Sequence, residues 1–384
     1  MKFSIAGLDV SSLCAPKNID EFRSSFSMNS GNLLFHYAAE KIVKLSPKKY
    51  NWSLKGASKD NKCGGVIIPM ANHLGTHVDL SNKGPNLNDV DVPVVVLGLG
   101  SQFSSSKVSH FNEIPEGSVR WLKKAADLSC GGKNIAVRGV FTYKLLKKLG
   151  LEDSVEVTGC QSNFINPSDS LGEELFNKFN SLTRSQLRDG ICVTAGNYNR
   201  RDLAKLEQSL IELIKGRSSS YVVQNPKHLI SLSSGWGDGV PEKVLQDIQT
   251  AWLPDVDLDL LPSWFQYHSS VFISVPQWLF EMSKKSFVVG TRIHGVQAAI
   301  QAGTPALCLC IDSRTKELCE FMKVPHVDAA NYHDGISFDD ILSEFRSWDY
   351  IQFDENRKRL ARKMKRFLVS NGVAPSEHML AVCK

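Results

Sequence analysis

Short apolar runs alternate with amphipathic helical patterns along most of the chain, and this alternation constrains the fold more than any other feature. The runs are rich in β-branched residues and cover 65–69, 93–99, 134–137, 155–158, 190–194, 221–224, 286–289 and 305–310. Their near-continuous apolar character is typical of strands covered on both faces of a parallel sheet. The helical patterns cover 33–45, 118–129, 142–149, 203–215, 276–284 and 296–302. Together they predict an α/β protein with doubly wound sheets.

The strands and helices fall into two sets, each about as long as one domain. The chain has 384 residues, which fits two Rossmann-like lobes. A polar stretch at 166–189, which includes Asn-Pro-Ser-Asp, separates the sets. We therefore predict an N-terminal lobe over 1–175 and a C-terminal lobe over 176–384. The second lobe ends in a basic helix, which we interpret as a solvated face, with an anionic docking surface as the alternative.

Charge, cysteine usage and hydropathy exclude several classes of protein. The 45 Lys and Arg against 40 Asp and Glu leave a net charge of +5, too small a surplus to indicate a nucleic-acid binder. The nine cysteines form no C-x-x-C pair, and Cys308 and Cys310 alternate in an apolar run, as buried strand residues do. Free buried thiols fit a reducing compartment. With no signal peptide or membrane span in the pattern, we expect a cytoplasmic protein, with the inner face of the membrane as a second location.

The most informative stretch is 287–325, where a buried strand is followed by Thr-Arg-Ile-His-Gly and then a helix. Arg292 and His294 thus lie beyond the carboxyl end of a parallel strand, where open α/β sheets bind ligands. The N-terminus of the next helix favours anions. In an extended segment these two side chains share one face, while Ile293 points into the core. Arginine beside imidazole suits an anionic substrate that needs proton transfer, and the alternative is structural capping.

Other strand ends supply further cations. Asn197 and Arg200 follow the run at 190–194, and we choose Arg200 as the second anion contact, with a paired surface arginine as the alternative. Arg138 also ends a strand, where a structural ion pair is the favoured interpretation. Glu317 follows the run at 305–310, where a nucleotide-sugar enzyme would hold a ribose.

Polar residues also lie where helices begin and strands end in the N-terminal lobe, and we expect them at the cleft. They are Asn32, Asn72, His77, Asp79 and Gln102. For Asn32 the alternative is helix capping. Asp79 is our second candidate for the general base. His73 and His77 have the spacing of some zinc ligands, but Gly75 lies between them and the glutamate of an H-E-x-x-H motif is missing, so we expect no metal.

An ordered series of motifs over 29–325 resembles the polysaccharide pyruvyltransferase family. The R-x-H-G, A-G-x-P and D-x-R-x-x-E-L-C pieces lie in the last stretch. Earlier pieces are GNLLFHYAAEKI at 31–42, PMANHLGTHVDL at 69–80, VVVLGLGSQ at 94–102, VRGVFTYKLLKKLG at 137–150 and VTGCQSNFINPS at 157–168. The resemblance implies two GT-B-like lobes facing a cleft. It also implies transfer of the pyruvyl group of phosphoenolpyruvate to sugar hydroxyls, with release of phosphate and no further cofactor.

The resemblance also implies roles for individual residues. It places Arg292 on the phosphate or carboxylate of phosphoenolpyruvate, Gly295 beside it, and His294 at the proton transfer, in a direction that the sequence leaves open. The expected product is a ketal on a surface polysaccharide or on its lipid-linked precursor. Two alternatives remain at this point: a nucleotide-sugar glycosyltransferase and a non-enzymatic sugar-phosphate sensor or scaffold.

Overall fold

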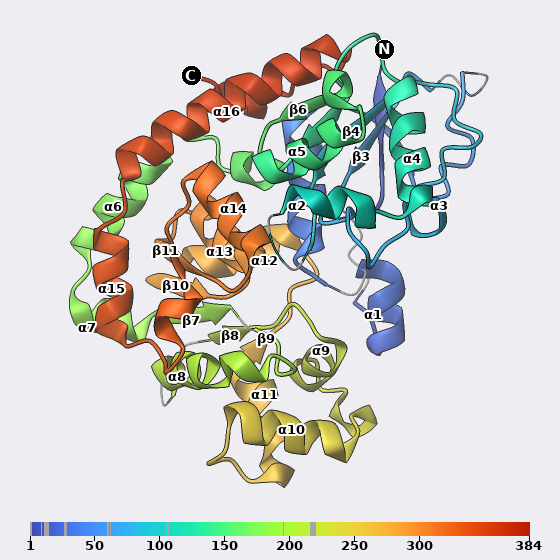
Figure 1. Ribbon diagram of the computed structural model, residues 1–384. Coiled ribbons are helices and arrows are strands. Elements are labelled where there is room, and N and C mark those ends of the chain that lie inside the picture. The colour runs from blue at the N-terminus through green and yellow to red at the C-terminus, as the bar shows by residue number, and fades with distance from the viewer. Residues whose placement is uncertain are drawn as a thin grey trace.

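Two α/β lobes, each built on one parallel sheet, make up the protein (Figure 1). The structure, a computed structural model, describes residues 2–8, 10, 15–26, 29–59, 61, 63–103, 105, 107–194, 196–215 and 220–384. Each sheet has six strands in these ranges, and every neighbouring pair is parallel. The predicted fold class of two Rossmann-like, GT-B-like lobes is confirmed.

The N-terminal sheet has the strand order β2-β1-β3-β4-β5-β6. Its strands are β1 (Phe3–Ala6), β2 (Leu45–Tyr50), β3 (Val66–Pro69), β4 (Val94–Leu99), β5 (Ile135–Val137) and β6 (Val155–Val157). Its helices are α1 (Ile19–Phe26), α2 (Asn32–Ile42), α3 (Leu80–Lys83), α4 (Glu116–Asp127) and α5 (Val140–Lys148). Every residue of β3, β4 and β5 is buried, which is why these strands are continuously apolar.

The C-terminal sheet has the order β12-β11-β10-β7-β8-β9. Its strands are β7 (Ile191–Thr194), β8 (Ser220–Val222), β9 (Ser269–Ser270), β10 (Phe287–Gly290), β11 (Ala306–Cys310) and β12 (His326–Asp328). The first helices of this half are α6 (Leu171–Ser181), α7 (Arg184–Asp189), α8 (Ala204–Ile214), α9 (Lys227–Ser233), α10 (Glu242–Trp252) and α11 (Leu261–His268). The later ones are α12 (Val275–Ser283), α13 (Ile293–Gln301), α14 (Ser313–Met322), α15 (Phe338–Arg346), α16 (Tyr350–Ser370) and α17 (Glu377–Val382).

The predicted helix over 33–45 is wrong at its carboxyl end. The helix α2 ends at Ile42, and the next residues form β2, which pairs with β1. Pro47 lies in this segment and lacks the N–H that a continuing helix needs. The chain therefore leaves the helix and adds an edge strand to the sheet.

The C-terminal helices pack against both halves of the chain. Asp354 of α16 accepts hydrogen bonds from the backbone N–H groups of Gly172 and Glu173 at 2.7 and 3.0 Å. The buried Arg357 donates to backbone carbonyls of the 163–168 segment, and α17 packs against α2 of the first lobe. The lobe boundary after residue 175 stays a prediction.

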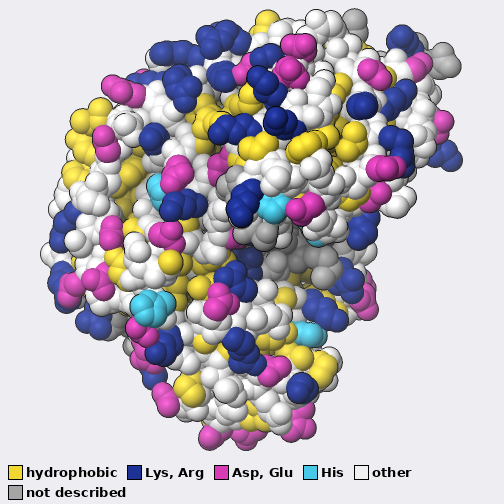
Figure 2. Space-filling view, in the orientation of Figure 1, with side chains coloured by type: hydrophobic (Ala, Val, Ile, Leu, Met, Phe, Trp, Pro, Cys, Tyr) yellow, Lys and Arg dark blue, Asp and Glu magenta, His cyan; other side chains and the backbone are white. Residues whose placement is uncertain are grey.

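The predicted basic helix is α16, which carries its charges along the surface of the molecule (Figure 2). One face is buried, and six basic side chains lie on the other. They are Lys358, Arg359, Arg362, Lys363, Lys365 and Arg366. No helix in the described ranges has the length and hydropathy needed to cross a membrane.

Candidate active site between the lobes

A cavity of about 690 Å³ lies between the two lobes and is lined by both. The first lobe contributes the start of α2 and the segments that follow β3, β4 and β5. The second contributes the segments that follow β7, β8, β10 and β11. Most of the lining thus comes from the carboxyl ends of parallel strands, as expected for a ligand site in α/β sheets.

Three arginines from three different strand ends line this cavity: Arg138, Arg292 and Arg314. Arg138 is only 5% exposed; it donates to the carbonyl of Met70 at 3.2 Å and lies over the ring of Phe35. Burial lowers the pKa of Arg138, yet a guanidinium stays protonated at neutral pH. No carboxylate in the described ranges pairs with it. The expectation of a structural ion pair there is therefore wrong.

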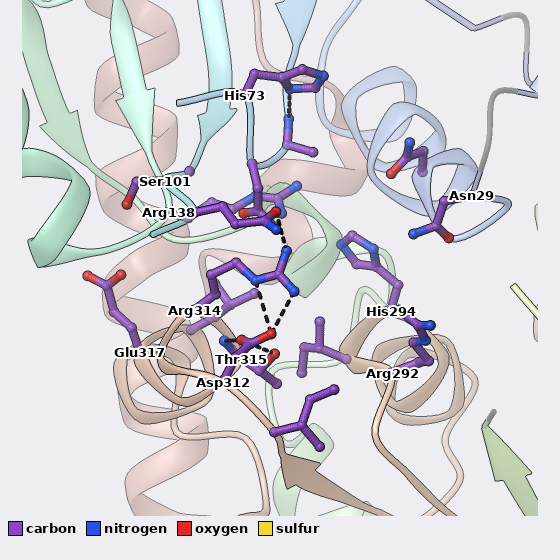
Figure 3. A pocket seen from close by; sticks show the side chains of 18 of the residues that line it. Asn29, His73, Ser101, Arg138, Arg292, His294, Asp312, Arg314, Thr315 and Glu317 are labelled. Atoms are coloured by element: carbon purple, nitrogen blue, oxygen red, sulfur yellow. Dashed lines mark hydrogen bonds and ion pairs between the residues drawn. The ribbon is translucent and has the colours of Figure 1, made fainter. Parts of the chain in front are cut away.

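Arg314 spans the cleft from the first turn of α14. Its guanidinium contacts the carboxylate of Asp312 at 2.6 Å and the side-chain oxygen of Gln102 in the first lobe at 2.6 Å (Figure 3). Asp312 also caps α14 by accepting from the backbone N–H of Thr315 at 2.8 Å. The cap fixes Asp312, and Asp312 in turn orients the arginine.

Arg292 is held by a backbone carbonyl and lies within electrostatic reach of a buried carboxylate. Its guanidinium donates to the carbonyl of Gly196 at 2.8 Å. Glu207, 1% exposed, accepts from the hydroxyls of Thr291 and Tyr221 at 3.1 Å each. Burial lowers the pKa of Arg292, and the charge of Glu207 opposes that change. Burial also raises the pKa of Glu207 itself.

His294 lies in the first turn of α13 and points into the cavity (Figure 3). The side chain is 9% exposed, and its Nε2 atom has no hydrogen-bond partner among the described residues. Burial, with added repulsion from Arg138 and Arg314, lowers the pKa of His294 to about 3. The imidazole is therefore neutral at physiological pH.

The prediction of an extended segment around His294 is wrong. Arg292 is the N-cap of α13, so Ile293 and His294 already belong to the helix. All three residues line the cavity, and Ile293 also packs against the hydrophobic core, as predicted. The chain turns into the helix directly after the cap, which ends the two-residue periodicity.

Seven of the ten predicted site residues line the cavity. They are Asn32, Asn72, His77, Gln102, Asn197, Arg292 and His294. Of the other three, Asp79 caps α3 by accepting from the N–H of Ser81 at 2.9 Å, and Arg200 pairs with Asp202 at 2.6 Å. Gly295 is buried in α13, where an added Cβ would lie 2.6 Å from the Cβ of Thr194. The roles assigned to all ten stay predictions.

The cavity also has an amide-rich part, which the sequence analysis missed. Gln224 and Asn225 follow β8, and Asn29 precedes α2. The Nε2 atom of Gln224 and the Oδ1 atom of Asn225 are buried and find no partner in the described part of the chain. A donor and an acceptor are thus both left for a ligand. The signal available in the sequence was the pair Gln224-Asn225 at the end of the apolar run that begins at residue 221.

Glu317 lines the same cavity, and its carboxylate is already engaged. It accepts from the backbone N–H of Phe141 at the start of α5 in the other lobe. Burial raises the pKa of Glu317, and this hydrogen bond opposes the change. Glu317 and Arg314 thus both connect α14 to the first lobe across the cleft.

Comparisons with known proteins give one family. A family model described as polysaccharide pyruvyl transferase matches residues 29–313. No curated protein matches the chain. Among solved structures, the S. aureus MnaA-UDP co-structure is similar at 14% identity and a TM-score of 0.42, covering 98% of this chain and 99% of that one. The UDP-GlcNAc 2-epimerase from Methanocaldococcus jannaschii has 12% identity and a TM-score of 0.38, with 94% of each chain covered. Neither likeness carries an argument about activity.

Proposed function

The chain belongs to the polysaccharide pyruvyl transferase family, and from this premise we propose that it transfers the pyruvyl group of phosphoenolpyruvate to hydroxyls of a sugar. The acceptor is a surface polysaccharide or its lipid-linked precursor. The observation that carries the proposal is the convergence of three arginines and His294 on one cavity. Phosphoenolpyruvate has about three negative charges near neutral pH, and guanidinium groups match phosphate and carboxylate geometry.

The donor fits the part of the cavity where Arg138 and Arg314 lie near each other (Figure 3). We assign the phosphate to these two guanidinium groups, which would stabilise it as the leaving group. Arg292 then serves the carboxylate. Asp312 keeps Arg314 in place, and the carbonyl of Gly196 keeps Arg292 in place, while the charge of Glu207 favours the charged form of Arg292.

The reaction needs protons to move in a balanced way. A sugar hydroxyl attacks C2 of the donor, and C3 gains a proton and becomes a methyl group. The bond from C2 to the phosphate oxygen then breaks, and a second hydroxyl closes the ketal at C2. Of the two hydroxyl protons, one ends on C3 and the other leaves with phosphate.

We assign to His294 the transfer of the proton that ends on C3. Its neutral Nε2 atom can accept a proton from the attacking hydroxyl. A bound trianion would offset the repulsion from Arg138 and Arg314 and so stabilise the imidazolium that forms. The same nitrogen can then donate to C3.

The amide-rich part of the cavity suits the acceptor. Gln224 and Asn225 present one donor and one acceptor, and a sugar hydroxyl can serve as either. No carboxylate is needed for a neutral sugar. The basic face of α16 would favour a position at the inner face of an anionic membrane, where a lipid-linked acceptor would lie (Figure 2).

Calorimetric binding tests the proposal. Phosphoenolpyruvate and a panel of nucleotide sugars are titrated into the wild type and Arg292→Ala. We expect saturable phosphoenolpyruvate binding that Arg292→Ala weakens strongly. Binding of a nucleotide sugar without phosphoenolpyruvate would refute the proposal and indicate a glycosyltransferase. Phosphate release with glycan extracts then identifies the acceptor.

A further inference from the structure

Three cysteine side chains meet inside the C-terminal lobe, behind the wall that α14 gives to the cavity. Cys308 and Cys310 lie on one face of β11, because residues two apart on a strand point the same way. Cys319 lies on α14, which packs on that strand. The three sulfur atoms all lie within 4.8 Å of one another.

The cluster is buried and reduced. The three side chains are at most 3% exposed, and all three are free thiols. Two other buried cysteines, Cys160 and Cys192, instead take a hydrogen bond from a neighbouring serine, at 3.1 and 3.4 Å. Buried cysteines often act as small apolar residues. That explains burial, but it does not explain why three of them converge.

The spacing fits a shared metal ion. A zinc–sulfur bond is about 2.3 Å long, so three sulfurs around one ion lie about 3.8–4.0 Å apart. The cluster reaches this spacing with an inward movement of about 1 Å or less. A disulfide would bring only two sulfurs to about 2.05 Å and would leave the third unused.

The ligand atoms that the cluster offers are all sulfur. Oxygen-preferring cations such as Mg²⁺ would find no suitable ligand here, whereas sulfur ligands select soft ions.

We propose that Cys308, Cys310 and Cys319 form a three-thiolate site for one soft cation of the Zn²⁺ or Cu⁺ class. Binding breaks three S–H bonds, forms three metal–sulfur bonds and releases three protons, with no change of oxidation state. The ion ties α14 to β11. Because α14 carries Arg314, the bound ion stabilises the wall of the cavity without touching the substrate.

Cadmium is the probe for this site, since Cd²⁺ gives an ultraviolet thiolate charge-transfer absorption. The reduced full-length protein is titrated with Cd²⁺, and its melting temperature is measured with and without the ion. We expect one equivalent per chain and a higher melting temperature. Both effects disappear in Cys310→Ser and Cys319→Ser and persist in Cys192→Ser, the matched buried control on β7.

A measurement on the wild type keeps the test valid if the variants fail to fold. X-ray absorption of the Cd²⁺ or Zn²⁺ complex counts the sulfur neighbours of the ion. Three sulfurs support the proposal. Fewer than three, oxygen or nitrogen ligands only, or no stoichiometric binding would overturn it, as would an absorption band that Cys192→Ser removes.

Discussion

Replacing Arg314 by alanine tests the donor site at a residue that connects both lobes. The substitution removes a cation from the cavity, together with its hydrogen bonds to Gln102 and Asp312. Asp312 keeps its hydrogen bonds to the N–H and hydroxyl of Thr315, so the cap of α14 survives. The variant is therefore expected to fold.

The magnitude follows from the interactions that are lost. A hydrogen bond to a charged group contributes about 1.5–3 kcal/mol, and about 1.4 kcal/mol corresponds to a factor of ten in Kd. The Kd for phosphoenolpyruvate should thus rise about 10- to 150-fold. The side chain of Arg314 is 28% exposed, so its pair with Asp312 contributes only about 0–1 kcal/mol to folding stability. Affinity should fall far more than the free energy of unfolding.

Calorimetry and urea denaturation measure the two quantities separately. Arg200→Ala is the matched control. Arg200 pairs with Asp202, two residues away in the sequence, just as Arg314 pairs with Asp312, but Arg200 does not line the cavity. Gln102→Ala isolates the loss of the bridge between the lobes from the loss of the cation. Unchanged affinity in Arg314→Ala, or an equal loss in Arg200→Ala, would refute the assignment of the donor site.

Three further predictions concern buried polar groups. His294→Gln should lower the rate of phosphate release about 10²- to 10⁴-fold, which is the usual contribution of a general acid or base. The Kd for phosphoenolpyruvate should stay nearly unchanged. A near-normal rate would contradict the catalytic assignment of His294. Glu207→Ala should lower the free energy of unfolding in urea by about 3–5 kcal/mol and raise the KM for the donor. Glu207→Gln keeps one acceptor oxygen and should lower the free energy of unfolding by less. An equal loss in the two variants would exclude a role for the acceptor oxygens. Burial lowers the pKa of His36 to about 3 and of His73 to about 4, below the value of 6.5 in the unfolded chain. As the pH falls below 6.5, the unfolded chain gains protons that the folded chain does not bind. The free energy of unfolding should therefore decrease. At pH 5 the loss is about 2 kcal/mol for each histidine, and equal urea midpoints at pH 7.5 and pH 5 would contradict it.

Most of the buried strands could be predicted from the sequence, whereas most of the edge strands in the described ranges could not. The exceptions are the edge strand β6, which was predicted, and the four-residue buried strand β1, which was missed. Strands covered on both faces, such as β4, must be apolar throughout, and this makes them visible in one dimension. Edge strands have a partner on one side only, so their sequences are free to be polar. The segments Leu45–Tyr50 and His326–Asp328 contain Lys, His and Asp and were missed for this reason.

Candidate site residues could be predicted where topology alone decides their position. Residues directly after a parallel strand reach the same edge of the sheet, as Asn72 and Arg292 do. What each side chain then does depends on local competition that the pattern does not show. Asp79 is taken by the N–H of Ser81, and Arg200 is taken by Asp202.

Arg138 and Arg314 were not predicted as site residues, because their joint position depends on the contact between the two lobes. Arg138 comes from the first lobe and Arg314 from the second, and each lowers the pKa of a neighbouring group in the same cavity. Neither lobe alone has this paired site, so no pattern within one lobe can reveal it. Two cations held near each other repel, and an anion between them removes that cost. Binding of the donor should therefore stabilise the contact between the lobes, and the bridges that α14 makes to Gln102 and Phe141 lie where that coupling would act.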